Sequence, residues 1–437
     1  MMGSTLLKKY FELNNDQEIK RDILAGITTF LSSAYIIIVN PMILSHAGLH
    51  FSAIVTATVI TASVCTILMG VYAKNPILIA PGMGLNAFFT YNVVMGMKVS
   101  PEIALGTVFW SGLIFLLLSF TNFRESIVKC IPQNIKYATA CGIGLFITFI
   151  GLQNAGVIIH HPATLVTIAP LTFETATFFL GLMITGFLLI KEIKGALLFG
   201  IIITTILSLP LGYFWGHKVI ISYHAALSMP DFSLVGALNL SDSLHIALFP
   251  AIFSFFFTDL FDSLSTFVGV AEASDLKESN GEFRNLKKSL IVDAFATWFA
   301  SIMGSSSGTA YIESATGIRE GGKSGLVALT AGLLFLPFLF FSPLLSCIPQ
   351  LATATGLVWV GLFMISPITK IKWNDLDQAI PAFLTLIFIP LGFSISKGIM
   401  WGFISHSFIQ IARGKGSDVP VLVYVIDVLG IISLAAH

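Results

Sequence analysis

"APGMGLNAFF", Ala80–Phe89, interrupts an apolar run that is otherwise long enough to cross a membrane. Pro81, Gly82 and Gly84 break a helix, and the polar amide of Asn86 follows them at once. Non-helical backbone at membrane depth leaves N–H and C=O groups that lipid cannot pair, so it is tolerated only inside protein or along a water-filled cavity. The stretch therefore predicts a broken spanning helix beside a binding site.

The composition is that of an integral membrane protein. Hydrophobic residues make up 55% of the 437 residues, charged residues make up 11%, and the mean hydropathy is +0.89. A soluble chain of this length would carry about 25% charged residues. The net charge is zero and no Lys/Arg cluster of the nucleic-acid type is present, so the lipid bilayer is the partner that composition implies.

Apolar stretches close to the length of about 20 residues that crosses hydrocarbon can be followed along the whole chain. They predict fourteen spans, at residues 22–45, 52–73, 79–95, 103–120, 135–152, 174–190, 195–213, 246–272, 287–303, 306–317, 325–342, 352–366, 378–394 and 397–411. We therefore expect an all-α polytopic fold. The apolar tail after residue 411 is expected to lie along the interface or to pack on the last spans.

The distribution of basic residues tests this count. Lys and Arg accumulate in short cytoplasmic loops. With both termini in the cytoplasm, 20 of the 23 Lys and Arg residues lie inside, and only Lys98, Lys218 and Lys397 lie outside. One missed or invented span would reverse every later loop, so the charges support this topology in the cell membrane.

Two related segments indicate an internal repeat. "CIPQNIKYATACGIGLF" begins at Cys130 and "CIPQLATATGLVWVGLF" begins at Cys347, 217 residues later. In the predicted topology the first copy precedes a span on the inside and the second precedes one on the outside. Seven spans per unit require this inversion, and inverted repeats are typical of carriers that alternate access around a central site. A chance match of two apolar segments is the alternative.

The second half contains a counterpart of the broken helix. "GSSSGTAYIES", Gly304–Ser314, again combines small residues with aromatic and polar ones. We expect both breaks to expose backbone donors and a helix N-terminus, at Leu85-Asn86 and near Tyr311-Ile312. Glycines that merely allow close helix packing would explain Gly82 and Gly84, but not the polar groups beside them.

Acidic residues within the predicted spans are the other signal. Asp259 and Asp262 are three residues apart and share one helix face, Asp293 lies in the next span, and Glu313 follows the second break. Because a carboxylate at mid-membrane costs about 2.5–3.5 kcal/mol even on insertion scales, these groups should face a cavity, pair with another group or hold a proton. For Asp293 a purely structural role is an equal alternative.

At these residues a family resemblance emerges. "GITTFLSSAYIIIVNP", "LIAPGMGLNAFF", "FFFTDLFDSLST", "YIESATGIREGGKSGL" and "PAFLTLIFIPLGFSI" closely resemble the AzgA-like purine permeases of the nucleobase:cation symporter (nucleobase-ascorbate transporter) superfamily. The resemblance implies two inverted seven-span repeats, short antiparallel strands in spans three and ten, and a core and a gate domain. The implied segments are a cytoplasmic N-terminal segment 1–21, core spans 22–120 and 246–342, gate spans 121–213 and 343–411, and a C-terminal segment 412–437.

The resemblance also implies proton symport of a purine base, adenine or guanine/hypoxanthine, with no cofactor besides the co-transported proton. The residues that it places at the base are Asp259, Glu313, Asn86, Ala87 and Phe88, and we expect Tyr311 and Thr309 of the second break to contact the base as well. It leaves Asp262 and Asp293 for proton coupling or support of the site. A homodimer is expected by analogy. Ser265-Thr266, Ser306-Ser307 and Gly392-Phe393 depart from the pattern of the family, which prevents a choice among the purines.

Other functions are less consistent with these residues. A carrier of xanthine, uracil or another small solute would share the fold, and so would an anion exchanger, but acidic residues at the breaks count against an anion. An enzyme would need a nucleophile with a base or a metal cluster. His46 and His50 have H-x-x-x-H spacing, but no HExxH pattern occurs and the four cysteines lack C-x-x-C spacing, so we expect neither an enzyme nor a metal site.

Overall fold

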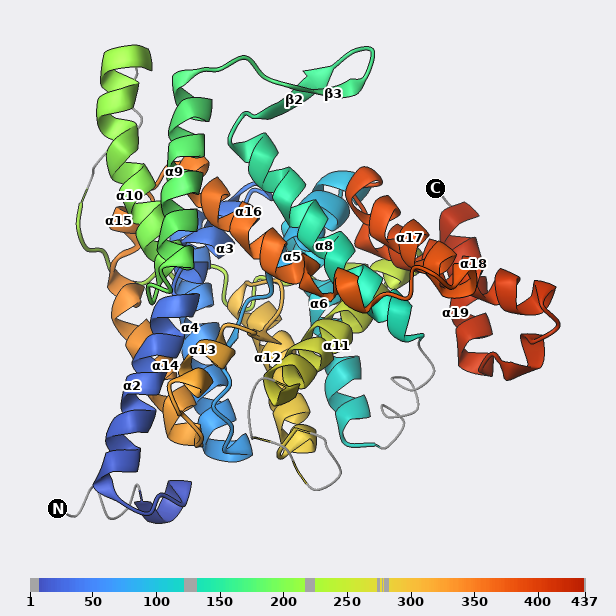
Figure 1. Ribbon diagram of the computed structural model, residues 1–437, viewed down its shortest axis with the longest axis horizontal. Helices are drawn as coiled ribbons and strands as arrows, with labels where there is room; N and C mark the ends of the chain where they lie inside the picture. The colour runs from blue at the N-terminus through green and yellow to red at the C-terminus, as the bar shows by residue number, and fades with distance from the viewer. Residues whose placement is uncertain are drawn as a thin grey trace.

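A computed structural model describes residues 8–121, 132–216, 225–272, 276, 278 and 283–435. The molecule is mostly helical (Figure 1). Of the described helices, eight are long and apolar enough to cross a membrane, and they span residues 16–45, 51–73, 101–119, 133–154, 173–190, 196–216, 246–271 and 350–370. The other predicted spans coincide with helical segments that are shorter, broken or less apolar. The structure is therefore that of a polytopic helical protein.

The first half contains the helices that precede residue 225. They are α2 (Asp16–Ser33), α3 (Ile36–Ser45), α4 (Phe51–Leu68) with η1 (Met69–Ala73), α5 (Met83–Ala87) with η2 (Phe88–Gly96), α6 (Pro101–Ser119), α8 (Gln133–Asn154), α9 (Phe173–Ile190) and α10 (Ala196–Leu211) with η3 (Gly212–Gly216). Strand β1 (Ile79–Ala80) precedes α5, and a hairpin of β2 (Ile158–His161) and β3 (Leu165–Ile168) joins α8 to α9. The hairpin projects from the end opposite the N-terminus (Figure 1).

The second half contains the elements from residue 225 onward. Its elements are η4 (Asp242–Leu244), η5 (Ile246–Leu248), α11 (Phe249–Glu272), α12 (Leu286–Met303), β4 (Thr309–Ala310), α13 (Ser314–Arg319), α14 (Gly325–Phe335), η6 (Leu336–Phe340), α15 (Ser342–Leu345), α16 (Gln350–Ile365), η7 (Ser366–Lys370), α17 (Leu376–Leu391), α18 (Ile395–Ala412), η8 (Gly416–Asp418) and α19 (Val421–Ala435). The two copies of the repeated motif place Gln133 and Gln350 at the first position of α8 and α16. Cys130 lies outside the described residues.

Local sequence explains where several helices begin. The side chain of Asn15 caps α2 by accepting from the backbone N–H of Glu18 at 2.9 Å. Ser100 caps α6, and Pro101 occupies the first turn, where its missing N–H is not needed. These caps set the helix boundaries.

The helices pack in two groups. In one, α2 and α4 pack against α14, and α6 packs against α12 and α11. In the other, α8 packs against α16 and α17, α9 packs against α10, and α17 packs against α18. The C-terminal helix α19 packs against α18, which is one of the two placements expected for the tail. Close approach within the first group requires glycine, because a Cβ on Gly325 would lie 1.9 Å from the carbonyl oxygen of Gly70.

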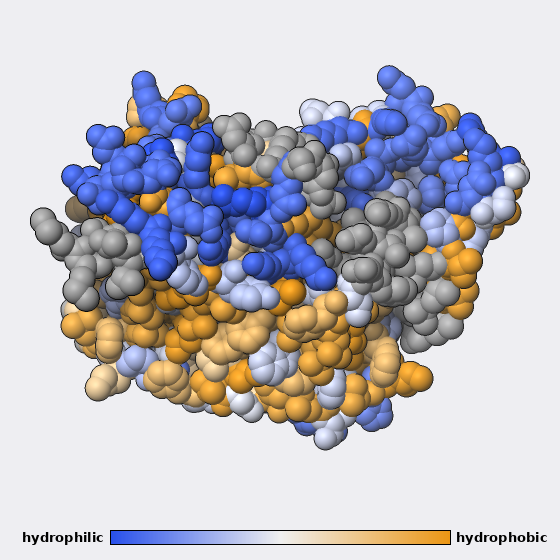
Figure 2. Space-filling model, turned by 90° about the horizontal axis from the view of Figure 1, so that it is seen from below, coloured by the Kyte–Doolittle hydropathy of each residue, from blue (hydrophilic) through white to orange (hydrophobic). Residues whose placement is uncertain are grey.

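The surface exposes large apolar side chains. Met183 is 71% exposed, Ile190 80% and Leu117 60%. Figure 2 views the molecule from below and shows hydrophilic residues gathered across one side of this face, with apolar residues over much of the rest. Soluble proteins rarely expose apolar patches of this extent, so the surface is suited to contact with lipid.

Candidate functional site

The two helix breaks meet in the structure. Strands β1 and β4 pair antiparallel, with Ile79 opposite Ala310 and Ala80 opposite Thr309. Beyond the strands, the N–H of Tyr311 donates to the carbonyl of Leu78 at 3.0 Å. Much of the backbone freed by the breaks is therefore satisfied within the protein, as burial in a membrane requires.

The helix starts differ from the predicted ones by two to three residues. Helix α5 begins at Met83, because Gly82 has an extended backbone and serves as its N-cap, and not at Leu85-Asn86 as predicted. Helix α13 begins at Ser314 with Glu313 as its N-cap, and not at Tyr311-Ile312. At the first break the backbone is extended up to Gly82, whereas at the second the residues between β4 and α13 form a turn and Glu313 is in the αR region; apolar periodicity shows neither boundary. Both starts still lie beside the breaks.

A cavity lies between these helix starts and α16. It has a volume of about 70 Å³ and is lined by Tyr35, Gly82, Met83, Gly84, Asp262, Thr266, Thr309, Ala310, Tyr311, Ile312, Glu313, Val360, Phe363 and Met364. This volume is below the range of about 300–1,000 Å³ that is common for small-molecule sites, so the cavity must widen to admit a ligand of that size. The glycines also allow close packing, since a Cβ on Gly84 would lie 2.6 Å from Ile143, so the packing explanation holds for them as well.

Two carboxyl groups reach this cavity. The hydroxyl of Tyr35 donates to Glu313 Oε1 at 2.6 Å, and Asp262 and Thr309 line the same cavity. Glu313 and Asp262 are each half-buried. The structure thus brings together four of the predicted residues, because Tyr311 also lines the cavity. A flat ligand with N–H donors would find carboxylate acceptors here.

Asp259 and Asp293 are buried to one side of the cavity. Asp259 is 1% exposed and accepts from the hydroxyl of Thr297 at 2.5 Å through Oδ2. Asp293 is fully buried and accepts from the N–H of Ala310 at 3.0 Å, so it fixes the end of β4. Among the described residues, neither acid lines the cavity. Asp262 lines the cavity and Asp259 does not, so the predicted contact of Asp259 with a base and the predicted coupling role of Asp262 remain predictions.

Asn86, Ala87 and Phe88 are buried behind the start of α5. The side-chain carbonyl of Asn86 accepts from the hydroxyl of Ser306, which ties the two breaks together. The ring of Phe88 packs edge-on against Phe255, with centroids 4.8 Å apart. In the part of the chain that the structure describes, none of the three lines the cavity that holds Glu313. Their predicted contact with a base remains a prediction.

Sequence reasoning missed Tyr35. It lies at the junction of α2 and α3, where the first spanning segment bends, and its partner Glu313 is 278 residues away in the chain. A tyrosine in "LSSAYIIIVNP" is polar only at its tip, so nothing in the local pattern sets it apart from the apolar residues around it. Among the residues flagged as departures, the Ser265 side chain lies outside the described part.

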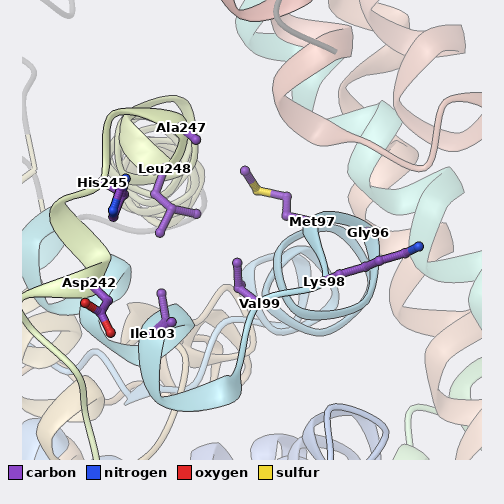
Figure 3. Close-up of a pocket in the computed structure, with 9 residues that line it drawn as sticks. All are labelled: Gly96, Met97, Lys98, Val99, Ile103, Asp242, His245, Ala247 and Leu248. Atoms are coloured by element: carbon purple, nitrogen blue, oxygen red, sulfur yellow. The ribbon is translucent and has the colours of Figure 1, made fainter.

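A second cavity is larger but lacks this chemistry. It is lined by Gly96, Met97, Lys98, Val99, Ile103, Asp242, His245, Ala247 and Leu248 (Figure 3). Figure 3 shows the Lys98 side chain directed away from the centre of the group. The carboxylate of Asp242 already accepts from the Asn239 amide at 2.7 Å. The candidate site is therefore the cavity between the helix breaks.

The chain is similar over nearly its whole length to proteins named as permeases. The chain is 38% identical over 442 residues to the adenine permease AdeP of Escherichia coli, covering 100% of this chain and 98% of that one. It is also 38% identical over 432 residues to the guanine/hypoxanthine permease PbuO of Bacillus subtilis, covering 97% and 99% of the two chains. Both relatives are named as permeases, which are transporters and not enzymes.

The fold is similar to that of a solved transporter. The transmembrane domain of the cyanobacterium bicarbonate transporter BicA superimposes with a TM-score of 0.67 at 15% identity, covering 89% of this chain and 98% of that one. At this identity the likeness concerns the fold alone. The Xan_ur_permease model, described as a permease family, matches residues 20–401. The chain therefore belongs to this permease family, as the resemblance implied.

Proposed function

We propose that the protein is a proton-coupled symporter that imports purine nucleobases across the cell membrane by alternating access. Relatives named as adenine and guanine/hypoxanthine permeases, each 38% identical over nearly the whole chain, support a purine substrate. The observation that carries the proposal is that Glu313 and Asp262 line one cavity at the junction of two broken helices. Both classes of purine remain candidates.

Base binding follows from matched donors and acceptors. A purine carries ring N–H and amino donors beside nitrogen acceptors. Oxygens of Glu313 and Asp262 accept from the donors, while backbone N–H groups at the start of α5, Met83 and Gly84, donate to the ring nitrogens. The rings of Tyr311 and Phe363 line the cavity and cover the faces of the base. A base with a different arrangement of donors and acceptors leaves buried groups of the site without hydrogen bonds and therefore binds more weakly.

Coupling follows from the charge of the buried acids. A carboxylate that moves through a closed, dehydrated state carries a large cost, which a bound proton removes. We assign the coupling proton to Asp259 or Asp262, which lie one helical turn apart on α11, and a supporting role to Asp293. Without a proton or a base the charged site resists the transition. The two fluxes are thereby coupled, and no other cofactor is required.

The proposed architecture is fourteen spans in two inverted repeats. The core domain comprises residues 22–120 and 246–342, the gate domain comprises residues 121–213 and 343–411, and both termini face the cytoplasm. The two groups of packed helices and the matched positions of α8 and α16 within the repeated motif support this arrangement. Pairing of two copies through the gate domains is part of the proposal.

Uptake by the variant Glu313→Gln tests the proposal. In a host that lacks base transporters, we expect the variant to insert at normal levels and to lose uptake of labelled adenine, guanine and hypoxanthine, because an amide cannot replace both acceptor oxygens. Glu102→Gln is the matched control, since Glu102 is exposed in the first turn of α6. Normal uptake by Glu313→Gln at limiting and saturating base would refute the assignment.

Two further measurements separate the alternatives. Uptake by the wild-type protein should collapse when a protonophore removes the proton gradient. Competition among unlabelled adenine, guanine, hypoxanthine, xanthine and uracil then ranks the substrates. Inhibition of uptake by uracil but not by purines would favour a pyrimidine carrier. If uptake depends on sodium, then sodium and not the proton is the coupled ion.

A further inference from the structure

Four side chains connect the two groups of helices at one end of the molecule. This end, where α3 finishes, is opposite the N-terminus and is the one that the charge distribution predicts to face outside; we call it the outer end. His46, the C-cap of α3, lies 2.8 Å from the hydroxyl of Tyr91 through Nδ1. Its Nε2 lies 2.8 Å from the side-chain nitrogen of Gln350. His46 thus links Tyr91 of η2 to the first residue of α16.

The hydrogen-bond roles follow from the partners. The amide nitrogen of Gln350 is a donor, so Nε2 of His46 accepts and carries no hydrogen. The Nδ1 of a neutral imidazole then holds the proton and donates to the oxygen of Tyr91. Burial lowers the pKa of His46, which favours this neutral form.

A second contact lies beside the first. Asn92, the residue after Tyr91, donates through Nδ2 to the carbonyl of Phe393 at 3.1 Å. Phe393 adopts a positive φ of 49° in the turn between α17 and α18, a conformation that is uncommon for a bulky residue. Its ring packs edge-on against Phe146 of α8 and Tyr91, with centroid distances of 5.1 Å and 6.3 Å.

These contacts are separated from the proposed base site along α16. Gln350 begins that helix, whereas Val360 and Met364 line the cavity with Glu313. At 1.5 Å per residue, ten to fourteen residues correspond to about 15–21 Å along the helix axis, roughly half a bilayer. A solute that enters from the outer end must therefore pass between the groups that these contacts hold together.

We propose that Tyr91–His46–Gln350 and Asn92–Phe393 form a latch that closes the outer end and opens once in every transport cycle. The repeat supports this role, because Gln350 ends the second Cys-Ile-Pro-Gln motif. Its counterpart Gln133 begins α8 at the opposite end and is exposed in this conformation. An inverted repeat that alternates access would engage the two glutamines in turn.

Cysteine accessibility tests the latch. Ala251 is 3% exposed and lines a cavity at the outer end together with Asn92 and Phe393, whereas Met364 lines the cavity that holds Glu313. Single cysteines at these two positions, in full-length protein whose native cysteines are serines, report access at each end through their rates of maleimide labelling in nanodiscs. The variant Gln350→Leu removes the donor to His46.

We expect Gln350→Leu to raise the labelling rate at position 251 by about two- to tenfold, the range that corresponds to one net hydrogen bond, and to lower the rate at position 364. Asn92→Leu, which breaks the second contact, should shift both rates in the same directions. The matched control is Gln153→Leu, because Gln153 is exposed near the outer end of α8. It should leave both rates unchanged.

Other outcomes would overturn the latch. Unchanged rates in both latch variants would show that the contacts do not hold the outer end closed, and faster labelling at both positions would indicate general loosening instead. The inference rests on the alternating access of the proposed function, yet labelling requires no substrate. Loss of the purine assignment would therefore leave this test intact, and a failed latch would leave the Glu313→Gln test intact.

Discussion

Replacing Tyr35 by phenylalanine removes one hydroxyl and leaves the ring in place. That hydroxyl donates to Glu313 Oε1 at 2.6 Å, and Tyr35 itself is 1% exposed. The bond holds one carboxylate oxygen of Glu313, a residue that lines the cavity. Tyr35 therefore acts as a positioning residue for the proposed base ligand.

The size of the effect follows from the type of bond. A hydrogen bond to a charged group contributes about 1.5–3 kcal/mol, and each 1.4 kcal/mol is tenfold in an equilibrium constant. We expect Tyr35→Phe to weaken base binding by about 10- to 150-fold if the carboxylate is charged when the base binds. A neutral carboxyl group would reduce the effect to about two- to tenfold.

Titration of the purified protein with adenine and guanine measures this effect directly. Tyr213→Phe is the matched control, since Tyr213 is 68% exposed. A thermal unfolding curve of each variant separates loss of affinity from loss of the folded state. Wild-type affinity in Tyr35→Phe would refute the positioning role, and equal losses of affinity and of folded protein would show a structural role only.

Two further predictions concern Asp259 and an outer loop. Thr297→Val leaves the buried carboxyl of Asp259 without its hydroxyl donor. We expect uptake to fall several-fold while equilibrium binding of the base changes by less than about twofold. The reason is that, among the described residues, Asp259 does not line the cavity. Equal losses of uptake and of binding would instead show that Asp259 contacts the base. In the loop, the N–H of Ser233 and the hydroxyl of Ser52 hold the pKa of Asp231 below its usual value. A carboxyl group whose pKa is lowered by folding stabilises the folded state at pH values above its pKa in the unfolded chain, about 3.9. This contribution should be lost as the pH falls below about 4. The melting temperature of Asp231→Asn should therefore fall less between about pH 6 and about pH 3.5 than that of the wild-type protein.

The segments that cross the membrane could be predicted from sequence because apolar length is a local property. Eight predicted spans correspond to described helices long and apolar enough to cross a membrane, whereas predicted span 306–317 is helical only from Ser314, and the glycine-rich breaks fell where helices stop. The antiparallel pairing of residues 79–80 with 309–310 came from the family resemblance and not from the residues themselves. Pairing across more than 200 residues leaves no periodic trace in either segment.

The roles of the acids depended on a rotation that sequence does not contain. Asp259 and Asp262 are three residues apart, which places them about 60° apart around α11. Apolar residues surround both, so the pattern cannot tell which carboxyl points to the cavity. Packing against α12 decides it, because Thr297 reaches Asp259. Tyr35 could not be identified from the sequence either, because its role depends on its hydrogen bond to Glu313, which is distant in the chain.

The two breaks contribute different chemistry to one cavity, and this difference bears on the class of solute. The first break contributes backbone groups at the start of α5 to the cavity, whereas the side-chain amide of Asn86 does not line the cavity and is hydrogen-bonded to Ser306. The second presents the carboxyl of Glu313 beside that of Asp262. A neutral base uses both kinds of group at once.

An anion would meet two carboxyl groups in the same space. At about 4 Å and an effective dielectric constant of about 20, like charges repel by about 4 kcal/mol, which is close to a thousandfold in affinity. The backbone donors of one short helix start would have to offset that repulsion. Thus, although the fold is similar to that of a bicarbonate transporter, the acids at the second break favour a neutral solute that carries N–H donors.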